Sequence, residues 1–159
     1  MMRNGTNSDA LTIKQEDPAQ PDVIGLLQNG EAESARLYPD ESNHHIPLDD
    51  LRQPEVRFLV ARDAEGKAVA TGAFVLQVGW AEIKRMWVEE SARGRGIARK
   101  VLDALIAEAR GAGVKALRLE TGVDSHAALA LYEKAGFKHR EPFADYRPDP
   151  LSVFMERSI

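Results

Sequence analysis

A glycine-rich turn between a strand-like run and a long helical pattern constrains the fold of this chain more than any other stretch. The apolar run Ile83 to Val88 leads into Arg93-Gly94-Arg95-Gly96-Ile97-Ala98, and a helical pattern continues to Arg110. Glycines let the backbone approach a bulky ligand closely, and the first N–H groups of a helix lack partners within it. Because the helix dipole and several arginines add positive charge at the same place, the turn predicts an anion site that favours phosphate.

Two well-known nucleotide-binding motifs do not fit this turn. A P-loop needs Lys followed by Ser or Thr directly after its last glycine, and Ile97-Ala98 stands there instead. A dinucleotide-binding turn needs a third glycine at the position of Arg99. A strand, a glycine turn and a helix also occur where nothing is bound, so the turn alone leaves an anion site and a packing turn open.

The composition describes an ordinary globular chain with one domain. A length of 159 residues suits a single core, and we expect one domain from 10 to 159 after a flexible tail at 1–9. The sequence has no cysteine, which excludes disulfides, thiol nucleophiles and cysteine-ligated zinc. A net charge of -4 argues against a general nucleic-acid binder.

The distribution of apolar residues points away from a membrane. No apolar run approaches the roughly 20 residues that span a bilayer, and the N-terminus has no apolar core typical of a secretion signal. We therefore expect a cytoplasmic protein without a membrane partner.

The order of the predicted elements indicates an α/β (α+β) fold with one mixed sheet. An antiparallel meander comes first, and a β-α-β crossover then places two parallel strands at the centre. Strands are expected at Ala10–Gln15, Val56–Arg62, Ala68–Val78, Glu82–Val88, Ala116–Thr121, Phe137–Glu141 and Leu151–Glu156. Helices are expected at Pro21–Leu37, Leu48–Gln53, Ile97–Arg110 and Ser125–Ala135.

Two local features qualify this assignment of helices. Asn29-Gly30 should interrupt the first long helix or split it in two, because both residues disfavour a helix interior. Asp124 or Ser125 should cap the last helix through its side chain, and Gly136 should end it.

Two motifs in this order resemble the GNAT (Gcn5-related) N-acetyltransferase family, in particular its small bacterial single-domain members. Arg93, Gly96 and Ala98 match the family's acetyl-CoA loop, Gln/Arg-x-x-Gly-x-Gly/Ala. Leu131-Tyr132-Glu133-Lys134-Ala135-Gly136-Phe137 matches the family's Tyr-x-x-x-Gly-Phe ending. Both motifs occur with a strand between them, and together they are more specific than either alone.

The resemblance implies an acetyl-CoA site that joins the loop to the two parallel strands. In the family, backbone N–H groups of the loop hold the CoA pyrophosphate, and the pantetheine arm lies where the parallel strands splay apart. Ser125 stands where many members have Asn, and it still offers one hydrogen bond. The donor-binding residues expected here are Met86, Trp87, Val88, Arg93, Gly94, Arg95, Gly96, Ile97, Ala98, Ser125 and Tyr132.

The resemblance also implies the chemistry, a direct transfer of the acetyl group to a primary amine. Tyr132 occupies the position of the acid that protonates the departing CoA sulfur, and Glu82 occupies that of a base on the preceding strand. From the residues alone, a Tyr132 packed on the core and a solvated strand-end charge at Glu82 are the alternative interpretations. Glu120, on the neighbouring strand, is an alternative base.

The acceptor is expected in the loops, because loops commonly carry specificity. A small-molecule amine, or a peptide or lysine amine, would contact Tyr38, Asn43, His44, His45, Arg85 and Tyr146. We expect no metal, since His44-His45 has no further ligands at recognisable spacing. The alternative function is a catalytically inactive acyl-CoA-binding sensor, and the last strand, Leu151 to Met155, could be an edge that supports a homodimer.

Overall fold

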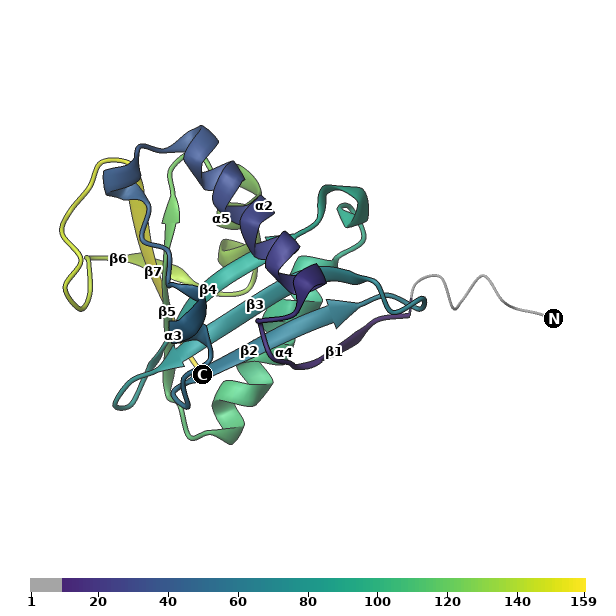
Figure 1. The fold of residues 1–159 in the computed structure, drawn as a ribbon. Coiled ribbons are helices and arrows are strands. Elements are labelled where there is room, and N and C mark those ends of the chain that lie inside the picture. The colour runs from purple at the N-terminus through teal and green to yellow at the C-terminus, as the bar shows by residue number, and fades with distance from the viewer. Residues whose placement is uncertain (1–9) are drawn as a thin grey trace.

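The computed structural model describes residues 10–159, which form a seven-stranded mixed sheet with helices on both faces (Figure 1). The strand order is β1-β2-β3-β4-β5-β7-β6. The strands are β1 Thr12–Gln15, β2 Val56–Arg62, β3 Ala68–Leu76, β4 Ala81–Val88, β5 Ala116–Gly122, β6 Lys138–Arg140 and β7 Ser152–Ser158. The proposed tail at 1–9 lies outside the described residues.

Helices connect these strands and cover the sheet. The α-helices are α2 Pro21–Leu37, α3 Leu48–Leu51, α4 Ile97–Gly111 and α5 His126–Lys134. Short 3₁₀ helices, η1 Asp40–Ser42 and η2 Glu90–Ala92, precede α3 and α4.

The two faces of the sheet have separate hydrophobic cores, because alternate residues of each strand point to opposite faces. On β2, Phe58 and Val60 pack with residues of α2 and α3, whereas Leu59 and Ala61 pack with residues of α4. Figure 1 shows α2 on the near face of the sheet and α4 behind it. The predicted mixed α/β sheet is therefore confirmed.

The parallel pair at the centre of the sheet is short. Strands β4 and β5 pair only at Ala81 with Leu117 and at Glu82 with Arg118, while β4 continues to Val88 and β5 to Gly122. Beyond these pairs the two strands separate. The expected splayed pair is thus present, and the rest of the facing edge of β4 has no partner strand.

A β-bulge bends β4 where it leaves β5. The register with β3 passes from Ala73 opposite Lys84 to Thr71 opposite Trp87, so that two residues of β4 oppose the single Gly72. Arg85, within the bulge, has φ of 59°, and its carbonyl accepts a hydrogen bond from Thr71 Oγ1 at 2.7 Å. A bulge increases local twist and redirects side chains, which suits the point where the strands part.

Helix α2 runs without interruption through Asn29-Gly30, so the predicted break is wrong. Tertiary contacts stabilise the helix there. Asn29 Nδ2 donates to both oxygens of Glu89, and Glu89 also accepts from Trp87 Nε1 at 2.7 Å. A Cβ on Gly30 would stand 3.6 Å from the Trp87 ring, so the glycine lies directly against β4. The two residues that weaken the helix form its contact with the sheet.

The last strand is not an edge. Strand β7 lies between β5 and β6, and it pairs with both, so the expectation that Leu151 to Met155 forms an exposed edge is wrong. The chain returns inward after the loop that follows β6, an order that periodicity alone does not determine. A homodimer stays a prediction without this support.

Substitution of Gly72 tests whether the bulge depends on close packing. A Cβ there would stand 2.7 Å from Val101 Cγ1 and 2.8 Å from Met86 Sδ. We expect Gly72→Ala to lower the free energy of unfolding by about 1–3 kcal/mol, because overpacking forces neighbours to shift. Urea unfolding of the variant measures this effect.

A matched control lies in α2. Gly25 is helical and a Cβ there meets nothing within 4 Å, so Gly25→Ala should raise the free energy of unfolding by about 0.5–1 kcal/mol. If both substitutions had the same sign and size, the close contact at Gly72 would not be the reason for its glycine.

Candidate active site

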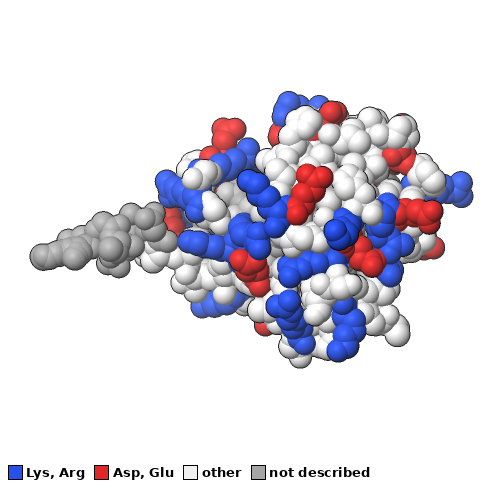
Figure 2. Space-filling model, turned by 180° about the vertical axis from the view of Figure 1, so that it is seen from behind, with Lys and Arg blue, Asp and Glu red and all other residues white. Residues whose placement is uncertain are grey.

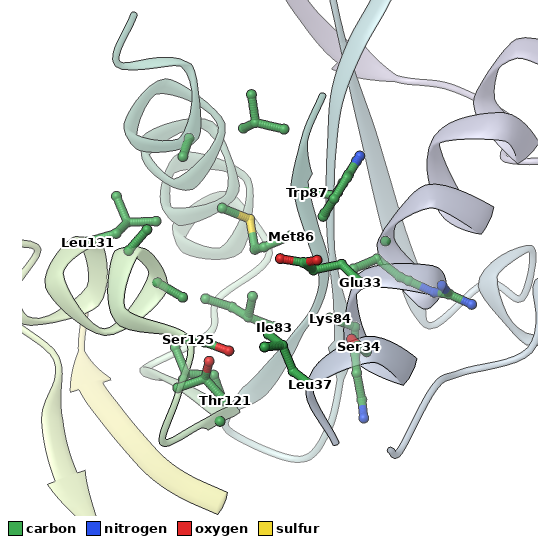
Figure 3. Close-up of a pocket in the computed structure, with 18 of the residues that line it drawn as sticks. Glu33, Ser34, Leu37, Ile83, Lys84, Met86, Trp87, Thr121, Ser125 and Leu131 are labelled. Carbon is green, nitrogen blue, oxygen red and sulfur yellow. The ribbon is translucent and has the colours of Figure 1, made fainter. Parts of the chain in front are cut away.

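A single cleft of about 690 Å³ opens where β4 and β5 separate. Figure 3 shows Ser125 and Leu131 on the α5 side of this space, Met86 near its centre, and Trp87 and Glu33 on the opposite side. The walls therefore come from the two strands, from α2, and from the starts of α4 and α5. The cleft provides a continuous space between the glycine turn and the loop after α2.

The glycine turn at one end of the cleft has the geometry of an anion site. Gly94 and Gly96 have φ of 80° and 74°, a region that side chains disfavour, and a Cβ on either would meet nothing within 4 Å. Gly96 is the N-cap of α4 and makes no side-chain cap. No N-cap side chain therefore satisfies the first N–H groups of this helix. These residues fit a pyrophosphate with backbone donors and the helix dipole.

The arginines of the turn contribute less directly than the sequence indicates. Arg93 Nε donates to the Val88 carbonyl at 3.1 Å, and its guanidinium lies 4.8 Å from the centre of the Trp87 ring. This side chain connects the turn to β4. Arg99 pairs with Asp103 at 3.0 Å, and Arg95 is exposed and does not line the cleft. The face behind that of Figure 1 carries many basic side chains, with acidic ones interspersed among them (Figure 2).

Tyr132 lies in the wall of the cleft, on α5. Its side chain is buried, and its ring packs edge-on against Phe137 with 5.5 Å between the ring centres. Burial raises the pKa of the Tyr132 hydroxyl, because the phenolate would lose hydration. The hydroxyl is therefore protonated over the physiological range.

A second cluster of polar groups begins at Glu82, where the parallel pairing ends. Glu82 is 7% exposed, and its Oε2 accepts from the Tyr146 hydroxyl at 2.6 Å and lies 3.2 Å from Lys84 Nζ. Lys84 Nζ also donates to the Tyr146 oxygen at 2.6 Å. Burial, followed by the hydrogen bond to Glu82, raises the pKa of Tyr146. The charge of Glu82 is thus balanced within the cluster.

Glu120 and His44 form a neighbouring pair across the cleft. His44 Nδ1 lies 2.8 Å from Glu120 Oε1, and Ser152 Oγ donates to Glu120 Oε2 at 2.8 Å. The His44 ring packs at a tilt of 57° against the Tyr146 ring, with 5.2 Å between the ring centres, and Lys84 Nζ donates to the His44 carbonyl at 3.2 Å. His44 therefore attaches the loop after α2 to β4 and β5, and Glu120 extends this contact to Ser152 on β7.

Tyr38 fastens the end of α2 to the turn between β5 and α5. Its hydroxyl accepts from the Asp124 N–H at 3.1 Å and bonds Ser125 Oγ at 2.9 Å. Ser125 is the N-cap of α5 but makes no side-chain cap, so the predicted side-chain cap is wrong for Ser125, whose hydroxyl bonds Tyr38 instead. The Asn43 amide donates to the Tyr38 carbonyl at 3.2 Å and so holds the loop's own backbone.

Arg85 connects the bulge to the loop and to α2. Its side chain is 8% exposed, and its guanidinium donates to Glu31 at 2.6 Å and to the Ile46 carbonyl at 2.9 Å. Its Nε is buried without a hydrogen-bond partner among the described residues. Burial, and then the charge of Arg85, lower the pKa of the adjacent His45, which favours the neutral ring. The guanidinium is occupied by these contacts.

Most of the residues proposed from the sequence surround this one cleft. Of the proposed catalytic and donor-binding residues, all except Arg95 line the cleft. Of the proposed acceptor-binding residues, all except Tyr146 line it, and Tyr146 is hydrogen-bonded to Glu82, which does. Sequence reasoning missed Lys84 and Ser152. The alternation of β4 could have indicated Lys84, because it is two residues from Glu82 and so on the same face.

The described residues provide neither a cluster of metal ligands nor a helix that could span a membrane. Within residues 10–159, no group of three His, Asp or Glu side chains is arranged to hold a metal ion. Over the same residues, no helix has the length and apolar character needed to cross a membrane.

Tyr38→Phe tests the attachment of α2 to the turn before α5. The variant loses the hydrogen bonds to Asp124 and Ser125, and we expect the free energy of unfolding to fall by about 1–2 kcal/mol without CoA present. A double-mutant cycle with Ser125→Ala, measured by urea unfolding, should show a coupling of about 0.5–1.5 kcal/mol. Strictly additive effects of the two substitutions would mean that their hydroxyls do not interact.

Comparisons with known proteins agree with this geometry. Residues 24–137 match the model of the acetyltransferase (GNAT) family. An IAA acetyltransferase of Azospirillum brasilense is 46% identical over 94% of this chain and 98% of its own length. A solved structure described as an acyl-CoA N-acyltransferase, from Klebsiella pneumoniae, has a TM-score of 0.81 and 39% identity over 94% of this chain and 98% of its own.

A more distant structure shares the fold alone. The PaiA N-acetyltransferase of Thermoplasma acidophilum, solved in complex with coenzyme A, has a TM-score of 0.75 and 15% identity over 94% of this chain and 99% of its own. From the family match and the similarity along nearly the whole sequence, this chain belongs to the GNAT family of acetyltransferases and is an acyltransferase.

Proposed function

We propose that this protein is an acetyl-CoA-dependent N-acetyltransferase that transfers the acetyl group directly to the primary amine of a small molecule, or to a peptide or lysine amine. One observation carries the proposal. A single cleft joins the free helix start at Gly96 to the Tyr132 hydroxyl and to the carboxylates of Glu82 and Glu120. A donor site for an anion and an acceptor site for a cationic amine thus share one space.

The donor side uses backbone groups of the turn and of β4. The N–H groups from Gly94 to Ala98 bind the pyrophosphate, and the edge of β4 from Met86 to Val88, which has no partner strand on the β5 side, binds the pantetheine arm as an added strand would. Bound acetyl-CoA supplies an activated thioester. The Val88 N–H is the donor proposed to stabilise charge on the thioester oxygen.

Tyr132 is proposed as the acid that protonates the departing sulfur. Its raised pKa would make it a weak acid toward a thiolate in water. In the buried wall of the cleft, however, a thiolate also loses hydration and becomes more basic. Because the same burial acts on both groups, the proton can pass when the C–S bond breaks.

A screen for acceptors tests the function as a whole. Release of free thiol from acetyl-CoA is followed with a panel of amines that contains polyamines, amino acids, peptides with free N-termini, lysine peptides and aromatic amines, together with IAA, which the name of the Azospirillum relative contains. We expect turnover on at least one primary amine. Tight binding of CoA without turnover on any of them would instead support an acyl-CoA-binding sensor.

Gly96→Asp should abolish the binding of CoA, because a carboxylate would stand beside the pyrophosphate at the positive end of α4. A ligand that binds only the folded state raises its melting temperature, so we expect CoA to stabilise the wild type and not the variant. Gly66→Asp is the matched control, since Gly66 also has a positive φ, of 82°, and lies in the β2–β3 turn outside the cleft. Normal CoA binding by Gly96→Asp would show that the phosphate lies elsewhere.

Tyr132→Phe should lower turnover by about 10- to 1000-fold while the affinity for acetyl-CoA changes little, as is typical of the loss of a general acid. Calorimetry measures the affinity, and thiol release on the best acceptor measures turnover. Turnover equal to that of the wild type would remove the Tyr132 hydroxyl from the mechanism and leave the ring as part of the core.

A further inference from the structure

We propose that His44 is the general base of this transfer, that Glu120 is the positioning residue that orients it, and that Glu82 organises the site without accepting the proton. The inference rests on the proposed function, because a base is needed only if an amine is the acceptor. It follows from the way two carboxylates in the same cleft are paired, one with a lysine and a tyrosine and the other with a histidine.

Glu82 is already occupied by two donors. Its Oε2 accepts from Tyr146 at 2.6 Å and lies 3.2 Å from Lys84 Nζ, and its side chain is almost fully buried. A carboxylate held this way has its charge balanced, and taking up a further proton would leave the Lys84 ammonium facing a neutral group. Glu82 therefore suits the placement of Lys84 and Tyr146 better than proton uptake.

The His44–Glu120 pair has the arrangement of an oriented base. Glu120 accepts from Ser152 Oγ at Oε2 and lies 2.8 Å from His44 Nδ1 at Oε1. An ionised carboxylate can only accept, so the proton of the neutral imidazole is assigned to Nδ1, and the lone pair is on Nε2. The histidine side chain is 38% exposed and that of Glu120 11%, so the ring is accessible and its orienting partner is shielded.

The loop is held so that this ring borders the reaction space. His44 follows η1, its carbonyl accepts from Lys84, and its ring packs on Tyr146. His44, Glu120 and Ser152 line the same cleft as Tyr132 and Val88. Base and acid thus face one space from opposite elements, the loop after α2 and helix α5.

His44 and Tyr132 together account for the protons that move in the transfer. His44 Nε2 takes one proton from the acceptor's ammonium group, and the nitrogen lone pair forms a C–N bond to the thioester carbonyl carbon. The C–S bond breaks, and its electron pair leaves with the sulfur. Tyr132 gives its proton to the sulfur and regains the second proton of the nitrogen. The products are an amide and a free thiol, and His44 returns its proton to solvent.

Several charged or titratable groups surround the His44 ring. Glu120 on β5 lies 2.8 Å from His44 Nδ1, Lys84 on β4 donates to the His44 carbonyl, and His45 is the next residue in the chain. Tyr146 and Asp149 face the ring from the segment between β6 and β7, where the positive form of His44 helps to lower the pKa of Asp149 after the hydrogen bonds from Ser42 and from the Leu151 N–H. As a base, His44 should make activity rise with pH as the ring loses its proton.

The kinetic test compares His44→Gln with His139→Gln. His139 forms a similar pair with Glu133, at 3.2 Å on the exposed surface and outside the cleft. With the best alkylamine of the acceptor panel, we expect His44→Gln to lower kcat by about 100- to 10,000-fold with unchanged binding of CoA, and to lose the rise of activity with pH. His139→Gln should match the wild type.

Amines that need no base make the test specific. Aniline and methoxyamine are unprotonated near neutral pH, so on either of them His44→Gln should stay within about tenfold of the wild type. An equal loss on alkylamines and on these two would mean that His44 only shapes the acceptor site, and would overturn its role as the base.

A readout without turnover comes from nitrogen NMR of the imidazoles. The chain has four histidines, and the signal missing in His44→Gln identifies His44. We expect its neutral ring to carry the proton on Nδ1, and Glu120→Gln to redistribute that proton toward Nε2. A wild-type ring protonated on Nε2, or no response to Glu120→Gln, would overturn the proposal.

Different results would overturn the transferase activity and the role of His44. No turnover on any amine would overturn the proposed function and the role of His44 with it. Normal kcat and pH dependence in His44→Gln would overturn the role of His44 alone and leave the transferase assignment standing.

Discussion

The interruption of hydrogen bonding between β4 and β5 is the constraint on which the site depends. The strands pair at Ala81 and Glu82 and then separate, so that a cleft opens in the middle of the sheet rather than on its surface. Backbone groups left free in a buried place are costly unless a partner satisfies them. A cleft edge of this kind therefore favours a ligand with amide groups of its own. The β-bulge opposite Gly72 turns β4 away at the same point, and the close contact of Gly72 with Val101 ties that bend to helix α4.

Arg85 shows how the bend is connected to the acceptor side. It is a non-glycine residue with a positive φ, its guanidinium is buried, and its Nε has no hydrogen-bond partner among the residues described. Such conformations cost of order 1–3 kcal/mol and persist where surrounding contacts hold them. Here those contacts reach Glu31 on α2 and the Ile46 carbonyl in the loop. The strand that would bind the donor and the loop that would bind the acceptor thus share one anchor, and a disturbance of either should be felt by the other.

Local sequence determined what could be predicted. The glycine turn, the helix after it and the Tyr132 motif are contiguous signals, and each lies where the sequence indicated. Helix α2 was expected to break because Asn29-Gly30 is unfavourable locally, but contacts with Glu89 and Trp87, about sixty positions away, override that preference. The insertion of β7 between β5 and β6 could not be predicted either, because it depends on pairing between distant segments. The association of Lys84 with Tyr146 has the same cause, since a loop far along the chain delivers the tyrosine.

The cleft also separates two kinds of electrostatics. At the glycine turn, the proposed donor end, Arg93 is engaged with Val88 and Trp87, so the backbone N–H groups of the turn are the nearest donors to an anion in the cleft. At the acceptor end, two carboxylates have different partners. Glu82 is paired with Lys84 and Tyr146, whereas Glu120 is paired with the imidazole of His44. When titratable groups in one site have environments that differ in this way, their roles in proton transfer separate as well. A carboxylate paired with a lysine and a tyrosine holds structure, and one beside an imidazole can support the uptake and release of a proton.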